Sequence, residues 1–383
     1  MSHTRKILYL AGFLFTLPVA LMAYINSSFI SSFVSEKLVG MIYTAGSATA
    51  IIGLILAPKI WRKLGGYKFL LSVTIIDALT IILFAFSKNA FSAAIFFVLG
   101  FTLNILIFSS LDELLKIYSQ ESAIGKTRGL YLSLCSMAWI IAQLLLGTFL
   151  GEYSFRTIYI ISFLIMTVFL VVSFYCLRNI QDPKYDKKNT KIYLGEFLRS
   201  KNLFRAYGMN LLLQFFYSWM VIYTPIYLSF YLGFSWKEIG IIFAIMLLPF
   251  FLIPFPLGKY TDRIGERKIL MWGFAIAGIA TLSLFFIGMH EIWIWALSLF
   301  TTRIGAASVE TAADSYFFKH IRPEQDEFID VYRSALPISY IIGPLLASVV
   351  LYFVPAFNFI YLILGAFMLY GIYLSSRIRR GDI

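Results

Sequence analysis

Apolar residues fill long stretches of the chain from one end to the other, and short polar stretches separate them. A helix needs about 20 apolar residues to cross the roughly 30 Å hydrocarbon core of a bilayer. Twelve stretches approach or exceed this length, at residues 7–33, 38–57, 69–87, 91–111, 129–151, 156–177, 203–232, 238–257, 269–289, 292–313, 334–354 and 357–374. Because backbone groups in a bilayer must find their partners within the segment, each stretch predicts a transmembrane α-helix.

The composition agrees with this pattern. Of the 383 residues, 60% are hydrophobic and only 14% are charged, whereas about one quarter of a typical soluble chain is charged. We therefore expect an all-α polytopic membrane protein rather than a large soluble domain.

The formal net charge of +12 would also suit a nucleic-acid partner, so the positions of the basic residues decide its meaning. With an even number of spans and a cytoplasmic N-terminus, only Lys37, Lys88, Arg156 and Lys237 lie in outside loops, and Arg303 lies within a span. The other Lys and Arg residues then face the cytoplasm, as the positive-inside rule requires. We expect a multi-pass protein of the cytoplasmic (inner) membrane with both termini in the cytoplasm, and no nucleic-acid partner.

The cysteines and histidines do not predict a metal or cofactor site. Cys135 and Cys176 lie inside predicted helices, where a thiol packs as a small side chain, and His3, His290 and His320 lack metal-ligand spacing. A phosphate-binding loop of the Walker type is also missing from the sequence, so ATP has no support as the driving force. We expect no cofactor and no metal.

The chain is doubled. Its longest polar stretch divides the spans into six and six, which predicts an N-terminal bundle at 1–177, a cytoplasmic loop at 178–202 and a C-terminal bundle at 203–383. Identical residues recur 200 positions apart without a gap, namely Gly40 and Gly240, Lys59 and Lys259, Gly65 and Gly265, and Lys68 and Lys268. Weak internal repeats of this kind mark secondary transporters, whose substrate site lies between the repeats near the membrane midplane.

A short motif in the second half identifies a family. GKYTDRIGERK, from Gly258 to Lys268, closely resembles the signature loop of the major facilitator superfamily, G-x-x-x-D-R-x-G-x-R-K. It lies between the second and third helices of its half, where that family repeats the loop. The resemblance implies a transporter whose twelve transmembrane helices form two pseudo-symmetric six-helix bundles. It also implies that Asp262 helps to lock a cytoplasmic gate by docking near Arg128, at the start of the fifth helix.

The motif also has a physical interpretation. Gly258 lets two helix ends approach closely, and Gly265 permits a turn that a residue with a Cβ resists. Asp262 can accept backbone N–H groups or face the positive end of a helix. The basic members of the motif are Arg263, Arg267 and Lys268. They hold the loop in the cytoplasm and can form ion pairs across the gate, although a basic loop that only fixes the topology is the alternative.

The copy in the first half departs from the motif. PKIWRKLGGYK keeps Gly65 but has Pro58 and Arg62 where the family has glycine and aspartate. Our hypothesis is a lock of reversed charge, in which Arg62 pairs with Asp330 or Glu327 just before the eleventh helix. The alternative is an ordinary solvated run of charges. Further residues that we assign to the gate are Asp112, Glu113 and Arg333.

The tenth span carries three charges in the stretch TRIGAASVETAAD. At 100° per residue, Arg303, Glu310 and Asp314 lie within about 40° of one another on one helix stripe. About 10.5 Å and 6 Å separate successive members along the helix axis. A charge at the centre of a bilayer costs roughly 2.5–3.5 kcal/mol, so the stripe faces protein or water. By resemblance, the first, fourth, seventh and tenth helices line the central cavity, which places this stripe at the cavity.

The three charged residues suit different roles. Arg303 is closest to mid-membrane and can bind an anionic group or a carbonyl of the substrate. Glu310 lies deep enough for loss of hydration to favour its protonated form, which a proton-coupling carboxyl needs. Asp314 lies nearer the inner gate, and we count it with Glu310 among the coupling acids. The alternative is a bracing network in which Arg303 neutralises the nearby carboxylates.

Other polar residues lie within predicted helices. Asp77, in TIIDALT of the third helix, is either a proton-relay acid or a buried, hydrogen-bonded or neutral one. The remaining candidates for the substrate cavity are Tyr24, Asn26, Asn104, Gln143, Asn210, Gln214, Tyr217 and Tyr340. Asn210, Gln214 and Tyr217 follow an i, i+4, i+7 pattern and share a helix face. Each of these side chains can instead make an interhelical hydrogen bond.

We therefore expect a monomeric secondary active transporter that moves a small organic solute by alternating access, coupled to protons. Arg303 and the aromatic-rich walls favour export of amphiphilic, drug-like compounds. Proton-coupled uptake of a sugar, peptide or carboxylate is the alternative. A non-transporting membrane sensor of the same fold is the alternative from another class. A membrane enzyme would need a cluster of His, Asp or Glu at the membrane surface, so we do not expect an enzyme.

Overall fold

The computed structural model describes residues 2–118, 124–152, 154–178, 190–254, 256–257, 264–321 and 327–378. Within these ranges the side chains of residues 2–3, 116–118, 124–129, 132, 151–152, 190–194, 327 and 330 are not described. The described residues form α-helices and one π-helical turn, and they contain no β-strand. The chain divides into two compact units, Met1–Asp186 with Ser235–Gly240, and Lys187–Phe234 with Ile241–Ile383.

The helices of the N-terminal part are α1 (Ser2–Ala23), α2 (Asn26–Ser31), α3 (Glu36–Leu64), α4 (Gly66–Ala85), α5 (Ala90–Tyr118), α6 (Ile124–Glu152) and α7 (Phe155–Cys176). Those of the C-terminal part are α8 (Thr190–Arg199), α9 (Lys201–Ile226) with the π-helical turn η2 (Tyr227–Tyr231), α10 (Trp236–Leu252), α12 (Glu266–Leu284), α13 (Ile292–His320), α14 (Glu327–Arg333), α15 (Ala335–Phe353) and α16 (Phe359–Ser376).

Each of the twelve predicted membrane stretches overlaps a helix in the described part of the chain. Eleven helices in the described part of the chain are long and apolar enough to cross a membrane. The stretch predicted at 238–257 corresponds to α10, which has 17 residues. This helix ends two residues before Pro254, because the residue that precedes a proline is pushed out of the helical conformation. The prediction of a polytopic all-α fold is confirmed.

The two repeat-related glycines make equivalent turns. Gly65 and Gly265 have φ angles of 80° and 85°, and each directly precedes the next helix of its half, α4 or α12. A side chain with a Cβ is strained at such an angle, which explains a glycine at both positions. The sequence repeat therefore corresponds to a repeated local structure.

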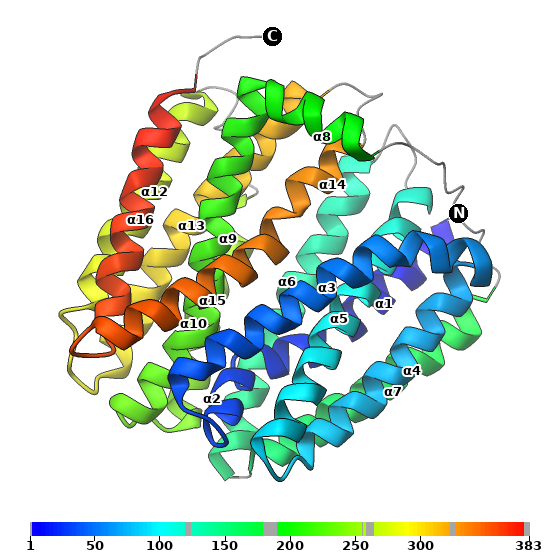
Figure 1. Cartoon of the computed structure of the whole chain (residues 1–383), viewed down its shortest axis with the longest axis horizontal. Coiled ribbons are helices and arrows are strands. Elements are labelled where there is room, and N and C mark those ends of the chain that lie inside the picture. The colour runs from blue at the N-terminus through cyan, green and yellow to red at the C-terminus, as the bar shows by residue number, and fades with distance from the viewer. Residues whose placement is uncertain are drawn as a thin grey trace. The chain divides into compact units, whose positions relative to one another are not determined.

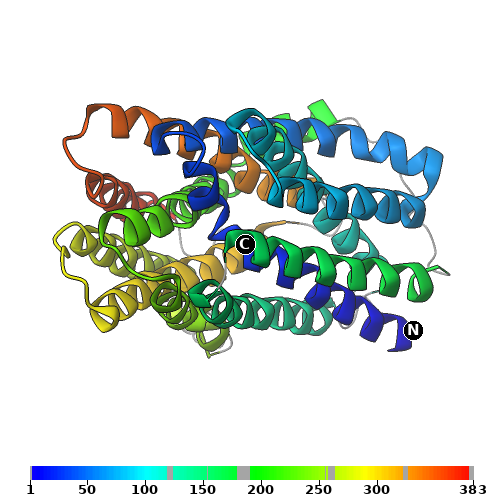
Figure 2. The same ribbon diagram turned by 90° about the horizontal axis from the view of Figure 1, so that it is seen from below.

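In the first unit, α1 packs against α6 and α7, while α5 packs against α3 and α4 (Figure 1). In the second unit, α12 lies between α13 and α16, and α9 packs against α13, α15 and α16 (Figures 1 and 2). The α9–α13 contact is the one that builds the candidate site described below.

Small residues place α13 close to α12. A Cβ added to Gly273 of α12 would lie 2.8 Å from Cγ2 of Val309 and 3.0 Å from the carbonyl oxygen of Gly305. A Cβ added to Gly305 would in turn overlap the backbone of Ala277. The stretch TRIGAASVETAAD therefore has two faces, one of small residues that packs on α12 and one that carries the charges.

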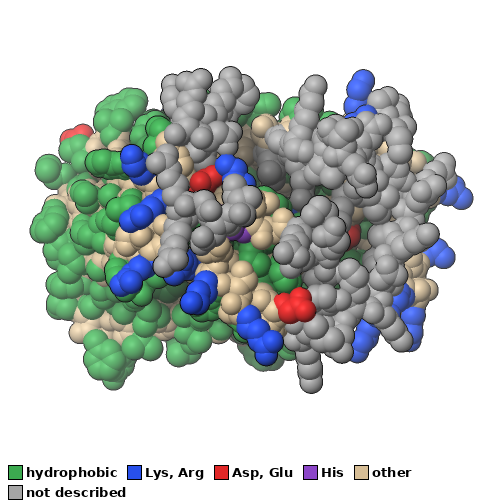
Figure 3. Space-filling view, turned by 90° about the horizontal axis from the view of Figure 1, so that it is seen from above, with side chains coloured by type: hydrophobic (Ala, Val, Ile, Leu, Met, Phe, Trp, Pro, Cys, Tyr) green, Lys and Arg blue, Asp and Glu red, His purple; other side chains and the backbone are tan. Residues whose placement is uncertain are grey.

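Exposed basic side chains gather at the ends of helices. They include Lys59, Arg62, Lys63 and Lys68 in the first unit, and Arg199, Lys201, Arg267, Lys268 and Arg377 in the second. Figure 3 looks onto the upper end of Figure 1 and shows Lys and Arg side chains distributed over that face. The predicted orientation of the chain depends on an unequal distribution of Lys and Arg between the two sides of the membrane.

Candidate functional site

Arg303 is buried in the middle of α13. Its side chain is 1% exposed. Its Cζ lies 5.0 Å from the ring centroid of Phe216 and 5.6 Å from that of Tyr217, both on α9. Its Nε and Nη1 atoms have no hydrogen-bond partner among the described residues. The guanidinium therefore lies against aromatic faces, and its Nε–H and Nη1–H groups have no acceptor among the described residues.

Glu310 lies two turns further along the same helix. The Tyr217 hydroxyl donates a hydrogen bond of 2.8 Å to its Oε2. The ring of Tyr217 is also in edge contact with Phe250 of α10, at 5.8 Å between ring centroids. Tyr217 thus contacts the guanidinium through its ring and the carboxyl through its hydroxyl.

Asp314 lies one turn beyond Glu310, at the level of α14. The Tyr332 hydroxyl donates to its Oδ1 at 2.9 Å. The ring of Tyr332 stacks on Phe317, with 4.1 Å between centroids and 12° between the ring planes. Because Tyr332 belongs to α14, this bond joins the last turns of α13 to the segment that leads into α15.

The polar stripe of α9 reaches the same place. Asn210 donates from Nδ2 to the backbone oxygen of Tyr332 at 3.0 Å, and Gln214 donates from Nε2 to Oδ1 of Asn210 at 3.4 Å. The structure therefore brings six predicted residues together in the second unit: Arg303, Glu310, Asp314, Asn210, Gln214 and Tyr217.

Sequence reasoning missed three members of this cluster, namely Phe216, Phe250 and Tyr332. The chain contains 38 Phe and 24 Tyr residues, so an aromatic residue in a helix carries no signal by itself. Position 216 could have been suspected, because it is next to Tyr217 on a presumed cavity helix. Tyr332 has no such pattern around it.

In the first unit, Asp77 and Asn104 form a separate buried pair. Asp77 of α4 is fully buried, and Asn104 of α5 donates from Nδ2 to its Oδ1 at 3.2 Å. The same Nδ2 donates to the backbone oxygen of Gly100 at 2.7 Å. Oδ2 of Asp77 has no partner among the described residues. Asn104, which we expected at the substrate cavity, thus serves here as the partner of Asp77.

The other predicted cavity residues of the first unit also bond between helices. Asn26 accepts a hydrogen bond of 2.9 Å from the hydroxyl of Tyr159 on α7. Gln143 of α6 is fully buried and donates to the backbone oxygen of Ala20 on α1 at 3.2 Å. Tyr24 is buried beside Trp139, at 5.9 Å between centroids. In the second unit, Tyr340 is partly buried on α15.

Part of the predicted gate lies outside the described residues. This holds for Gly258, Asp262 and Arg263, and for the side chains of Arg128 and Asp330. Of the remaining gate residues, Asp112 and Glu113 are partly buried, and Arg62, Arg267, Lys268 and Arg333 are exposed. Arg62 donates from Nε to the backbone oxygen of Pro58 at 3.1 Å. Its pairing with Asp330 or Glu327 stays a prediction.

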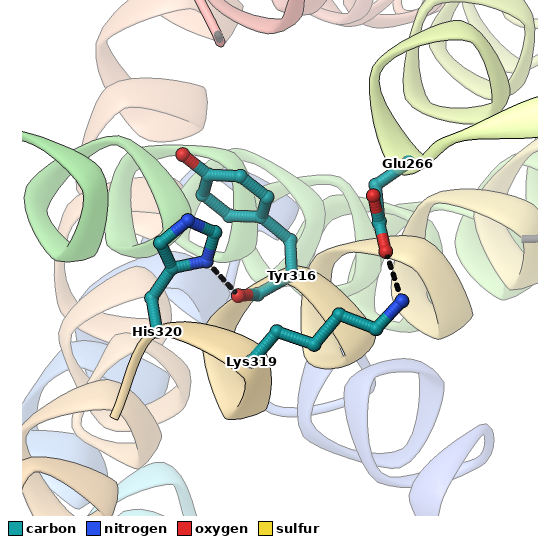
Figure 4. Close-up of polar contacts among 4 residues, drawn as sticks. All are labelled: Glu266, Tyr316, Lys319 and His320. Carbon is teal, nitrogen blue, oxygen red and sulfur yellow. Dashed lines mark hydrogen bonds and ion pairs between the residues drawn. The ribbon is translucent and has the colours of Figure 1, made fainter. Parts of the chain in front are cut away.

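An ion pair braces the helix that follows the motif. Lys319, at the end of α13, reaches Oε1 of Glu266 in the first turn of α12, at 2.7 Å (Figure 4). His320 next to it contacts the backbone oxygen of Tyr316 through Nδ1, at 2.7 Å. Glu266 occupies a variable position of the motif, so the sequence did not mark it.

Two further observations concern other possible ligand sites in the second unit. A groove of about 500 Å³ between α12 and α13 is lined by Trp272, Ile279, Leu297 and Thr301 among others, with no ionisable side chain. Thr301 lies 200° around α13 from Arg303, so this groove is on another face of the helix. Within the described ranges, no three His, Cys, Asp or Glu side chains group as a metal site would need.

Comparison with known proteins places the chain among membrane transporters. The model of the Major Facilitator Superfamily matches residues 7–248 and 211–381. No curated protein sequence matches the chain.

Three solved structures have the same fold. A bacterial homologue of the human lysosomal transporter Spinster, inward-facing and unoccupied, has a TM-score of 0.70 at 13% identity, over 98% of this chain and 93% of that one. An auto-inhibited POT family peptide transporter has a TM-score of 0.78 at 12% identity, over 99% and 98%. The POT family transporter PepTSo has a TM-score of 0.77 at 11% identity, over 97% of each chain. At these identities the likeness shows the fold alone.

Proposed function

The chain belongs to the major facilitator superfamily, a family of secondary transporters, and on this premise we propose that it couples the movement of a small organic solute to protons. Its resemblance to that family at residues 258–268 is confirmed by the match to the family model. Membership indicates a multi-pass membrane transporter rather than an enzyme.

The observation that carries the proposal is the hydrogen bond between Tyr217 and Glu310 beside the buried Arg303. A carboxyl can hold and release one proton, and a hydroxyl partner keeps it oriented in both states. Because Arg303 is fixed in charge and Glu310 is not, the net charge of this cluster changes by one when Glu310 takes up a proton. We assign Glu310 as the coupling site, with Asp314 as its neighbour towards the gate.

Arg303 serves in this proposal as the anchor for the solute. Its charge is buried, and its Nε and Nη1 atoms have no hydrogen-bond acceptor among the described residues. The rings of Phe216, Tyr217 and Phe250 next to it suit a solute with an apolar part. Both the export of amphiphilic compounds and the uptake of a sugar, peptide or carboxylate fit such a site, and the direction of the proton effect separates them.

The placement in the cell is part of the same proposal. We place the chain in the cytoplasmic membrane as a monomer. The excess of Lys and Arg in the predicted inner loops supports both termini being in the cytoplasm.

The test is transport by the purified protein in proteoliposomes that contain a pH-sensitive dye. Adding a transported solute is expected to move protons across the membrane. Proton movement in the same direction as the solute indicates symport, and movement in the opposite direction indicates antiport. Net solute uptake or release without any proton movement would refute the coupling. The absence of transport for every solute of a broad library would favour the sensor alternative.

A further inference from the structure

Building on the proposed function, we propose that the solute is a monocarboxylate whose anionic group binds Arg303, and that its binding and the protonation of Glu310 favour each other.

Arg303 has two N–H donor atoms, Nε and Nη1, without an acceptor among the described residues. A guanidinium keeps its charge under all conditions relevant to a cell. Here it is 1% exposed, and its Nε and Nη1 have no acceptor among the described residues. The faces of Phe216 and Tyr217 offset part of the lost hydration. These rings lie over the face of the guanidinium and do not accept hydrogen bonds from the N–H groups in its plane. The Nε–H and Nη1–H groups can therefore donate to a ligand.

The two acids of the stripe accept hydrogen bonds from tyrosines. Oε2 of Glu310 accepts from Tyr217 at 2.8 Å, and Oδ1 of Asp314 accepts from Tyr332 at 2.9 Å. In the described part of the chain, neither Nε nor Nη1 of Arg303 donates a hydrogen bond to either of them. A bracing network through these atoms would require such a bond. An acceptor for them is therefore best supplied by the solute.

The shape and charge of a guanidinium favour one class of anion. The planar fork of a guanidinium matches the two oxygens of a carboxylate. A single guanidinium compensates one negative charge, so a phosphate ester with two charges would leave one of them buried without a partner. Phe216 and Tyr217 flank Arg303, and Phe250 touches Tyr217. An apolar or aromatic group next to the carboxylate would pack against these rings.

The coupling follows from the charges around Glu310. A charged Glu310 lies one tyrosine away from Arg303, where it offsets the guanidinium and repels an incoming anion. A protonated Glu310 neither offsets the guanidinium nor repels the anion. Protonation of Glu310 therefore increases the affinity of Arg303 for an anion, and a bound anion increases the proton affinity of Glu310 by the same factor.

The other ionisable groups near Glu310 do not reverse this sign. Tyr217 faces it from α9, Asp314 follows it on α13, and Tyr332 of α14 bonds Asp314. On α12, the ionisable residues are in the first turn, where Glu266 pairs with Lys319. Lys319 is nine residues from Glu310, or about 13.5 Å along the helix. Asp314 is an acid, so it adds to the repulsion of an anion rather than opposing it.

This linkage favours symport, because the state that binds the anion is also the state that has taken up the proton. A proton gradient directed into the cell would then drive uptake. The structure-based proposal thus favours the uptake alternative over the export of drug-like compounds that the aromatic content suggested.

The experiment measures thermal stabilisation of the purified full-length protein by matched pairs of probes. The probes are benzoate, phenylacetate and N-acetylphenylalanine, each compared with its own primary amide, in mildly acidic and mildly alkaline buffer. We expect the acids to stabilise the protein and the amides not to. We also expect the affinity for the acids to fall as the pH rises, by up to about tenfold per pH unit for one linked proton.

Variants then assign the effect to residues. Arg303→Gln is expected to lose binding of the acids, and Arg303→Lys to weaken it, because lysine keeps the charge but not the fork. Glu310→Gln is expected to retain binding and to lose its pH dependence. Lys319→Gln is the matched control, because it removes one positive charge from the same helix at an exposed position.

Several results would overturn the inference. Equal stabilisation by acids and amides would do so, as would acid binding that persists in Arg303→Gln. If Arg303→Gln does not fold, the comparison of acids with amides on the wild-type protein decides the question. Proton-coupled transport of uncharged solutes alone would refute the carboxylate site and leave the proposed coupling standing. Carboxylate transport without proton movement would refute the coupling and leave the anion site standing.

Discussion

The hydroxyl of Tyr217 donates to Oε2 of Glu310 at 2.8 Å, while the ring of the same tyrosine lies under the guanidinium of Arg303. One side chain of α9 therefore touches both the fixed and the titratable charge of α13. The contact joins residues 93 positions apart in the sequence. It gives a physical route by which a proton on one residue changes the charge that a ligand meets at the other.

Replacing Glu310 with glutamine is expected to separate exchange from accumulation. The amide has nearly the same shape but cannot take up and release a proton. Glu310→Gln should therefore retain solute counterflow in proteoliposomes and lose accumulation driven by a pH gradient. Glu266→Gln is the control, since it removes an acid of the exposed ion pair with Lys319 and should keep both activities. Full gradient-driven accumulation by Glu310→Gln would remove this residue from the coupling.

Replacing Tyr217 with phenylalanine tests the two contacts of the tyrosine separately. The ring that faces Arg303 and Phe250 is kept, but the hydrogen bond to Glu310 is lost. A hydrogen bond to a charged group contributes about 1.5–3 kcal/mol. We expect proton-driven transport to slow about tenfold or more, with carboxylate affinity within about twofold of wild type.

Tyr217→Leu should reduce both quantities, because the aromatic face is then absent as well. A slower Tyr217→Phe with an equally weakened carboxylate affinity would show that the hydroxyl contacts the solute directly.

The close packing of α13 on α12 predicts a large cost for Gly305→Ala. The added Cβ would overlap the backbone of Ala277. Because the overlap is with backbone atoms, a change of side-chain rotamer cannot relieve it. Overpacking of this kind costs about 1–3 kcal/mol. Thermal unfolding in detergent should show a clear decrease in Tm. Gly208→Ala on α9 is the matched control, because an added Cβ there meets nothing within 4 Å. Equal Tm values for the two variants would contradict the packing described for α12 and α13.

The bond between Tyr332 and Asp314 is expected to stabilise the junction of α13 with α14. Tyr332→Phe keeps the stacking on Phe317 but removes the hydroxyl that donates to Asp314. We expect a loss of about 1.5–3 kcal/mol in stability. A double-mutant cycle with Asp314→Ala, which removes the accepting oxygen, followed by thermal unfolding, measures the interaction between the two side chains. A coupling energy close to zero would mean that the bond does not contribute.

Asp77 is expected to behave differently from Glu310. It accepts a hydrogen bond from Asn104, and among the described residues no cation lies within salt-bridge distance of it. Asp77→Asn keeps an oxygen that can accept from Asn104, so this variant should fold normally. It should also retain accumulation driven by a pH gradient. Loss of accumulation in Asp77→Asn, with the wild-type Tm retained, would place this acid in the coupling pathway.

Much of the fold could be predicted because it depends on local properties of the chain. The length of each apolar stretch predicts a membrane helix, and the basic loops predict an orientation. Gly65 and Gly265 predicted equivalent turns, and both have a positive φ angle. The three charges of TRIGAASVETAAD share one stripe because helical periodicity alone places them there.

The partners of those charges could not be predicted in the same way. Nothing in the pattern indicated that Tyr332 would bond Asp314 or that Phe216 would lie against Arg303. Asn104 was expected at the substrate cavity, yet its amide bonds Asp77 on the neighbouring helix. These contacts depend on how helices distant in the sequence cross, and the sequence does not contain that geometry in any short segment.

The sequence by itself thus determined the membrane-spanning helices, the doubled architecture and the family, because hydrophobic length, charge asymmetry and a loop motif are local. The tertiary structure decided which acid meets which tyrosine and that Arg303 keeps unpartnered N–H groups between aromatic faces. The physical reason is that a buried polar group acquires its partners only when helices pack, and the packing of α9, α13 and α14 fixes those partners.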